Sequence, residues 1–77
     1  MIKQTVMLKS INDVKDFVNF VNRFDFDIDL IAGRYVVDAK SLMGIFSLNL
    51  NAPIDLVAYS DNCPDLTEGL KAFSADN

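Results

Sequence analysis

Residues 24–48 read FDFDIDLIAGRYVVDAKSLMGIFSL, and within them the hydrophobic pattern changes from that of a strand to that of a helix. Apolar side chains alternate with aspartates over residues 24–30, which predicts a strand with one buried face and one acidic, solvated face. Ala32 and Gly33 are a two-residue hairpin signal, because glycine adopts the positive φ that such turns need. Residues 34–37 then predict a short antiparallel partner strand.

The residues that follow predict a short helix. Ser41 is a good N-cap, and residues 42–48 predict about two helical turns after it. At about 100° per residue, the five apolar side chains of this segment cover most of its circumference, so only some of them can be buried. We expect Ile45 and Leu48 to face inward. We expect three others to face outward and to form a partner-binding surface: Leu42, Met43 and Phe46. The alternative is local packing or self-association of this segment.

The residues before this stretch predict a strand and a longer helix. Residues 3–9 alternate between apolar and polar side chains, as in a half-buried strand. An apolar stripe then recurs at helical spacing: Val14, Phe17, Val18 and Val21. Ser10 or Asn12 can cap the start of this helix of about three turns.

The residues after the stretch predict one more strand and a last helix. Residues 54–59 alternate again, and the turn at residues 60–62 can cap a helix with three apolar positions on one face: Leu66, Leu70 and Phe73. Cys63 precedes Pro64 at the start of this helix, where we expect it to be an ordinary small residue rather than a reactive thiolate. The order β-α-β-β-α-β-α predicts an α+β fold, with three helices on one face of a four-stranded antiparallel sheet.

Length and composition narrow the classes of protein. The 77 residues, 51% of them hydrophobic, predict a single domain over residues 1–77 and argue against disorder. The net charge of −4 argues against nucleic acid and anionic membranes as partners. No stretch is long and apolar enough for a membrane helix, and the start lacks the layout of a signal peptide. One cysteine makes no internal disulfide, so we expect a cytoplasmic protein.

The chain contains no histidine. Catalytic triads that use imidazole, histidine metal ligands and phosphohistidine are therefore excluded. The three aspartates of residues 25–29 do not form an EF-hand loop, because Leu30 stands where that loop needs glycine. Neither an acid–base pair nor a nucleophile–base pair can be assembled, so we expect no enzyme activity, no metal and no cofactor.

Residues 39–48, AKSLMGIFSL, closely resemble the Lys-Ser-(Ile/Leu)-Met-Gly motif that opens the second helix of HPr. HPr is the small phosphocarrier of bacterial sugar phosphotransferase systems. The resemblance runs without a gap over roughly residues 2–74, through Phe24, the Gly33 hairpin and the strand at residues 54–59. It implies the HPr fold, an open-faced β-sandwich with the same order of elements.

The resemblance also implies that the phosphocarrier reaction has been lost. HPr relays phosphate through a histidine at the start of its first helix, followed two residues later by an arginine. In the ungapped register these positions are Ser10 and Asn12. A phosphate ester on Ser10 would be a far poorer donor than phosphohistidine, and Asn12 supplies no positive charge for an incoming phosphate.

A second, regulatory site is implied at Ser41. In Gram-positive bacteria, an ATP-dependent HPr kinase/phosphorylase modifies the serine that matches Ser41, and a histidine-lacking relative acts only as a partner of a transcription factor. A phosphate on Ser41 would lie beside free backbone N–H groups, with Lys40 near enough to contribute. We therefore expect a regulatory protein of carbon catabolite control that binds proteins through residues 41–48. Two alternatives stay open: Ser41 is only a helix cap in a constitutive scaffold domain, and the chain forms a homodimer.

Overall fold

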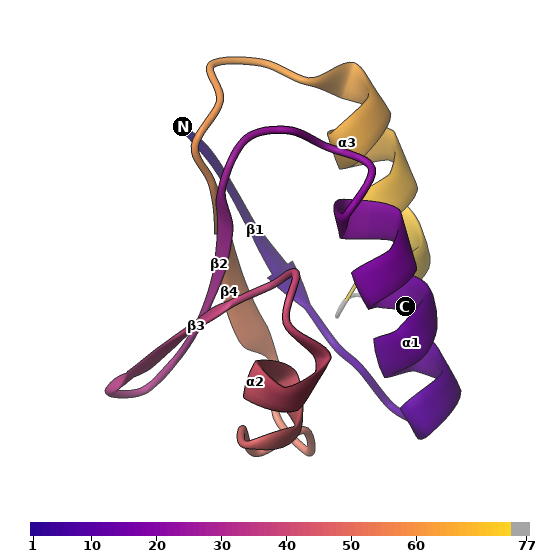
Figure 1. Ribbon diagram of the computed structural model, residues 1–77, viewed down its shortest axis with the longest axis vertical. Helices are drawn as coiled ribbons and strands as arrows, with labels where there is room; N and C mark the ends of the chain where they lie inside the picture. Colours follow the sequence, from indigo (N-terminus) through magenta and orange to yellow (C-terminus); the bar gives the residue numbers. More distant parts are fainter. Residues whose placement is uncertain (75–77) are drawn as a thin grey trace.

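The computed structural model describes residues 1–74 as a four-stranded antiparallel sheet with helices along one face (Figure 1). Its elements, in chain order, are β1 (Ile2–Val6), α1 (Ile11–Val21), β2 (Ile28–Ala32), β3 (Tyr35–Asp38), α2 (Leu42–Phe46), β4 (Ile54–Ala58), α3 (Pro64–Leu70) and a 3₁₀ turn (Lys71–Phe73). The predicted α+β class and the order β-α-β-β-α-β-α are both confirmed. No helix among these residues is long and apolar enough to cross a membrane.

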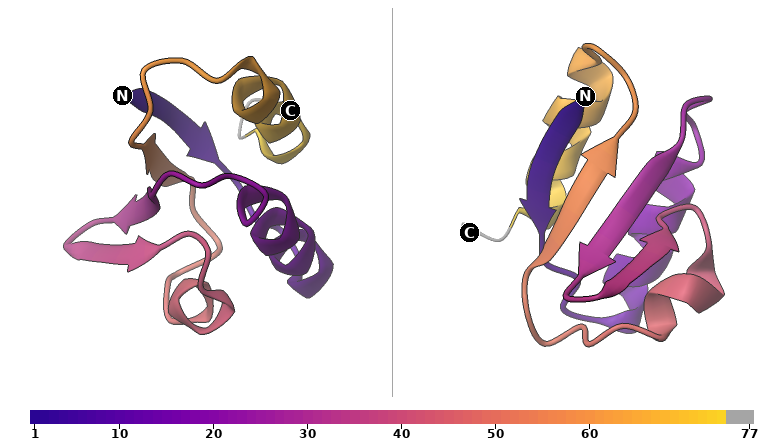
Figure 2. Two further views of the ribbon diagram at one scale, coloured as in Figure 1. Left: turned by 45° about the horizontal axis from the view of Figure 1, so that its top comes forward. Right: turned by 90° about the vertical axis from the view of Figure 1, so that its left-hand side faces the viewer.

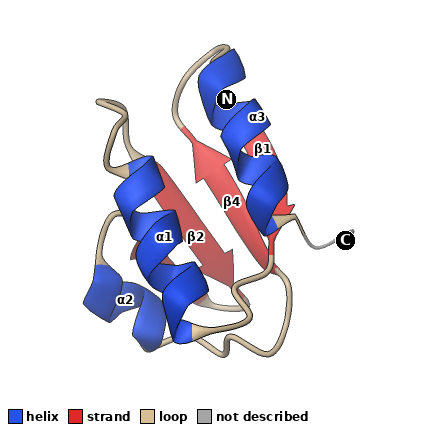
Figure 3. Cartoon of the chain, turned by 90° about the vertical axis from the view of Figure 1, so that its right-hand side faces the viewer, coloured by secondary structure: helices blue, strands red, loops and turns tan. Residues whose placement is uncertain are grey.

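The strands lie in the order β1-β4-β2-β3, so that β1 and β3 are the two edges (Figure 2). All neighbouring pairs are antiparallel. The alternation of side chains decides which face is buried: Ile28 and Leu30 of β2 point into the core, whereas Asp29 lies on the open face. In Figure 3, α1 and α3 lie across the covered face, and α2 lies at one corner beside the lower half of α1.

Several predicted boundaries are wrong by one to four residues. The second strand begins at Ile28 instead of residue 24, because Phe24 packs against Phe20 and Phe26 ahead of the ladder. The first strand ends at Val6 instead of residue 9, and the N–H of Met7 donates to the carbonyl of Phe73 (2.8 Å). The short helix ends at Phe46, and the last strand ends at Ala58.

The hairpin turn is one residue later than predicted. Ala32 still pairs with Tyr35, so Gly33 and Arg34 form the two-residue loop and the partner strand covers residues 35–38. Gly33 has φ of 60°, which suits the first loop position of a type II′ turn. Glycine was therefore the correct signal for the turn. It occupies the first loop position, whereas the prediction placed it at the second.

The helices bury the stripe that their spacing predicts. Val14, Phe17 and Val21 of α1 are buried, and so are Leu66 and Leu70 of α3. The two other predicted members, Val18 and Phe73, are only partly buried and pack against this core. The predicted cap of the last helix at residues 60–62 is wrong. Cys63 occupies the N-cap position without a side-chain cap bond, and a thiol is only a weak hydrogen-bond acceptor. Pro64 follows in the first turn, where its missing N–H costs nothing.

Gly69 lets α3 approach α1 closely. A Cβ atom at this position would overlap the ring of Phe20, which packs against the backbone of α3 there. Phe17 of α1 and Phe73 of the 3₁₀ turn that follows α3 add an edge-to-face contact, with ring centroids 5.4 Å apart. The helical cost of a glycine, about 1 kcal/mol relative to alanine, is thus offset by this close packing.

Candidate functional site: the α2 surface and the start of α1

Ser41 caps α2 as predicted. Its backbone is extended, and its Oγ accepts a hydrogen bond from the N–H of Gly44 (3.2 Å). The side chain is half-buried, and the N–H of Ser41 donates to the carbonyl of Asp38 (3.0 Å). The first turn of α2 is therefore held by hydrogen bonds on both sides of its N-cap.

Lys40 does not contribute to the start of α2 in the way that the sequence suggested. Its ammonium group donates to the carbonyl of Phe24, and its N–H donates to Oδ1 of Asp38 (2.9 Å). The carbonyl of Lys40 in turn accepts from Asn22 at the end of α1 (3.3 Å). Lys40 thus ties the residue before α2 to the end of α1, and its charge is directed away from the Ser41 hydroxyl.

Two of the three side chains predicted to face outward on α2 do so. Met43 is 77% exposed and Phe46 is 39% exposed. Leu42 is only half-buried and packs against the core, so its assignment to the outer surface is wrong; α2 packs against both α1 and β3, which cover the start of the helix. Ile45 and Leu48 are buried, as predicted.

The segment that contains α2 carries no charged side chain. Residues 41–54, SLMGIFSLNLNAPI, contain no acidic or basic side chain. Exposed methionine and phenylalanine on an uncharged segment are typical of an adaptable contact surface. We call Met43 and Phe46, together with the Ser41 cap, the α2 surface.

The start of α1 has the same cap in a charged setting. Oγ of Ser10 accepts from the N–H of Asp13 (3.1 Å), while Oδ2 of Asp13 accepts from the N–H of Lys9 (3.0 Å). This reciprocal arrangement satisfies donors on both sides of the helix start. Ser10 is thus the N-cap, and Asn12 lies exposed within the first turn.

The sequence analysis missed one exposed residue at the start of α1. Ile11 is 63% exposed, and α1 begins at the same end of the molecule as α2 (Figures 1 and 3). Its position off the apolar stripe of Val14, Phe17 and Val21 was the available signal. The start of α1 therefore carries an exposed apolar side chain directly beside the Ser10 cap.

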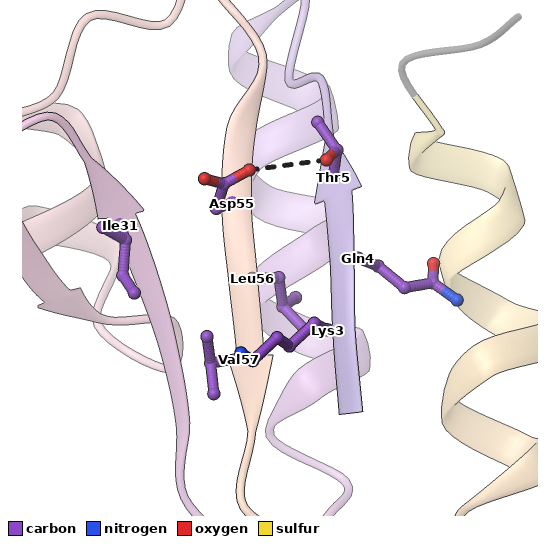
Figure 4. Close-up of a pocket in the computed structure, with 7 residues that line it drawn as sticks. All are labelled: Lys3, Gln4, Thr5, Ile31, Asp55, Leu56 and Val57. Atoms are coloured by element: carbon purple, nitrogen blue, oxygen red, sulfur yellow. Dashed lines mark hydrogen bonds between the residues drawn. The ribbon is translucent and has the colours of Figure 1, made fainter. Parts of the chain in front are cut away.

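The open face of the sheet has shallow hollows. One lies over β1, β4 and β2 and contains a hydrogen bond from the Thr5 hydroxyl to Oδ1 of Asp55 (3.4 Å) (Figure 4). Another is lined by Asp27, Asp29, Asp38 and Tyr59. The Tyr59 hydroxyl donates to Oδ2 of Asp29 (3.1 Å), and this bond raises the pKa of Tyr59 above its ordinary value, with smaller contributions from desolvation and from the charges of Asp29 and Asp27.

The described part of the chain shows no cluster of side chains that could hold a metal ion. Residues 1–74 contain no group of three or more cysteine, aspartate or glutamate side chains arranged to hold an ion. Cys63 is free and half-buried at the start of α3.

Two solved structures resemble the chain closely in fold. The crystal structure of HPr-C-His from Thermoanaerobacter tengcongensis has a TM-score of 0.78 and 25% identity, and it covers 94% of this chain and 89% of that one. The phosphocarrier protein HPr from Bacillus anthracis str. Ames has a TM-score of 0.71 and 26% identity, with 95% of each chain covered. No protein-family model and no curated protein matches the sequence. By its fold the chain is HPr-like, which supports a relation to the phosphotransferase system to which HPr phosphocarrier proteins belong.

Proposed function

We propose that this chain is a non-enzymatic, HPr-like regulatory protein of the bacterial cytoplasm that binds other proteins through the α2 surface. The supporting observation is the juxtaposition at α2. Ser41, whose hydroxyl caps the helix, directly precedes a segment that exposes Met43 and Phe46 and has no charged side chain over residues 41–54. Its partners are an HPr kinase/phosphorylase and a transcriptional regulator of carbon catabolite control.

The proposal includes the loss of the phosphocarrier reaction. Ser10 holds the histidine position of the resemblance, and its Oγ is already engaged by the N–H of Asp13. A phosphate arriving there would meet the carboxylate of Asp13 within the same cap. Asn12 offers no compensating charge, so neither the chemistry of the acceptor nor the local field favours transfer.

Phosphorylation of Ser41 would act through charge. A phosphoserine carries about −2 at neutral pH, which would take the formal net charge of the chain from −4 to about −6. The new charge would lie at the start of residues 41–54, a segment that is otherwise uncharged, with Asp38 and Lys40 just before it. A partner that binds Met43 and Phe46 would then gain or lose affinity according to its own charge at that point.

The first test uses the HPr kinase/phosphorylase of the source organism with ATP, read by intact mass. We expect one phosphate on the unaltered chain and none on Ser41→Ala. Ser47→Ala is the matched control, because Ser47 lies at the other end of α2 and its hydroxyl donates to the carbonyl of Gly44 (2.6 Å). Retained phosphate in Ser41→Ala would contradict the assignment. No phosphate on any form would favour the alternative, a constitutive scaffold domain with an HPr fold.

The second test uses phosphoenolpyruvate and enzyme I. We expect no acid-labile phosphate on the unaltered chain. Acid-labile label would contradict the argument drawn from Ser10 and Asn12. A Ser10→His/Asn12→Arg variant supplies the two missing groups and is the form in which such label is expected.

A further inference from the structure

The two edges of the sheet differ in how they are covered. At the β1 edge, the N–H of Met7 donates to the carbonyl of Phe73 (2.8 Å), and Val6 forms an antiparallel bridge with Ser74. The later part of the chain thus closes this edge. At the other edge, no element of residues 1–74 pairs with the outer side of β3 (Figure 2). An unpaired edge strand is a template for pairing with another chain.

Alternate residues of β3 direct their backbone N–H and C=O groups toward β2, and the residues between them direct these groups outward. The N–H of Ala39 donates to the carbonyl of Ile28 (2.9 Å), so the odd-numbered residues of this segment direct their backbone groups toward β2. Backbone groups alternate along a strand between its two neighbours. Those of Val36 and Asp38 therefore face away from the sheet, and the carbonyl of Asp38 also accepts the N–H of Ser41 (3.0 Å). Arg34 lies in the hairpin loop, directly before the strand.

The side chains of β3 do not protect this edge. Tyr35 is 70% exposed and Val36 is 60% exposed. The strand, YVVD, contains neither proline nor lysine, the residues that most often block edge pairing. Its protection is limited to its short length, the charge of Asp38 and the bond of the Asp38 carbonyl to Ser41, all but the first of which act at one end of the strand.

Charge complementarity identifies the partner as a second copy of this chain. We propose that β3 pairs antiparallel with β3 of a second molecule, with Val36 opposite the partner's Val36. Outward backbone groups must meet outward backbone groups, so even-numbered residues lie opposite even-numbered ones. In this register Arg34 lies opposite the partner's Asp38. The two-fold axis creates a second, identical pair, so the dimer contains two pairs of opposite charges. Registers shifted by two residues place Val36 opposite a charged residue instead.

The same pairing would relieve a repulsion inside each molecule. Asp29 of β2 lies directly opposite Asp38 of β3, and like charges in such a cross-strand pair are destabilising. Within residues 1–74, no basic side chain forms an ion pair with either carboxylate. Arg34 of the partner subunit would supply that charge, and the two sheets would join into one eight-stranded sheet. This inference goes beyond the proposed function and does not rest on it.

Charge exchange tests the register. Sedimentation equilibrium is measured for the unaltered chain, Arg34→Asp, Asp38→Arg and the double variant. We expect a reversible dimer for the unaltered chain and a dissociation constant at least about tenfold higher for each single variant, because both symmetric pairs then become like-charged. The double variant restores two opposite-charge pairs and is expected to dimerise again. Lys15→Asp on α1 makes the same change of charge as Arg34→Asp and should leave the dimer intact.

Amide hydrogen exchange gives a second readout that does not depend on the variants. Protection of the Val36 amide should rise with protein concentration, whereas the Val37 amide, which faces β2, should be protected throughout. Three results would overturn the proposal: an unaltered chain that stays monomeric up to about 1 mM, equal effects of Arg34→Asp and Lys15→Asp, or a double variant that stays monomeric. Loss of the dimer in Met43→Lys but not in Arg34→Asp would place the interface on α2 and would also overturn it.

Discussion

The helices α1 and α2 begin in the same way and continue differently. Each has a serine N-cap whose Oγ accepts the N–H of the residue three positions later, at 3.1 Å in α1 and 3.2 Å in α2. The first helix then runs for eleven residues and buries Val14, Phe17 and Val21. The second runs for five residues and buries only Ile45.

The difference lies in what surrounds each helix. The first is held by α3 through the Phe20–Gly69 contact and by the 3₁₀ turn after α3 through the Phe17–Phe73 ring pair, and charged residues surround its cap. The second lies at a corner of the sheet (Figure 3) and exposes apolar side chains beside its cap. Identical cap chemistry therefore serves structure in α1, whereas in α2 it lies beside a surface suited to binding.

The largest expected effect concerns the anchoring of α2. Because Ile45 is its one buried side chain, Ile45→Ala should lower the free energy of unfolding by about 2–5 kcal/mol, measured by denaturant titration. Met43→Ala, two residues away on the exposed side, is the control and should change it by less than about 0.5 kcal/mol. Equal losses for the two variants would show that α2 is not anchored through Ile45.

A second variant breaks the contact that holds α1. Gly69→Ala places a methyl group where the Phe20 ring lies, so we expect a loss of about 1–3 kcal/mol in stability despite the higher helix propensity of alanine. Phe20→Leu makes room at that point and should recover part of the loss when the two substitutions are combined. An increase in stability with Gly69→Ala alone would contradict the close packing of α1 and α3.

The two caps can be compared directly. Ser10→Ala and Ser41→Ala each remove one cap bond and should each cost about 1 kcal/mol of stability in the same titration. Only Ser41→Ala should abolish labelling by the kinase. The comparison breaks down if Ser10→Ala removes the label as well while the protein stays folded.

Surface charge on α2 should matter for binding and hardly at all for stability. Met43→Lys is expected to leave the free energy of unfolding within about 0.5 kcal/mol and to weaken modification by the kinase. Tyr59→Lys adds the same charge at an exposed position near the opposite end of the molecule, where β4 leads into the turn before α3 (Figure 1). Kinase activity that falls equally in both variants would argue against a surface confined to α2.

The smallest effect lies on the open face, away from both helices. The pKa of Tyr59 is raised by its hydrogen bond to Asp29, so the folded state holds this proton more tightly than the unfolded chain does. The stability that this bond contributes is present below the unfolded pKa of about 10 and is lost as pH rises through the folded value. Tyr59→Phe should show a weaker loss of stability above pH 10 than the unaltered chain, and an equal or steeper loss would contradict the assignment.

Periodicity was sufficient for the elements and for most of the buried face. The change from alternation to helical spacing after Lys9, and back again after Arg23, predicted every helix and strand in order. The ends of the helices and strands were predicted less accurately, because they depend on contacts with residues outside the element. Phe24 continues the alternation of β2 but packs against Phe20, and Met7 bonds to Phe73, which is distant in sequence.

The candidate site divides in the same way. The sequence alone determined that the chain has no histidine, that Ser10 and Ser41 can each cap a helix, and that residues 41–54 are uncharged, because these properties are local or compositional. Only the tertiary structure decided that Leu42 packs against the core, that Lys40 binds the carbonyl of Phe24, and that β3 is left at an open edge. Burial and partner choice depend on which segments meet in space, and those meetings join residues far apart in the chain.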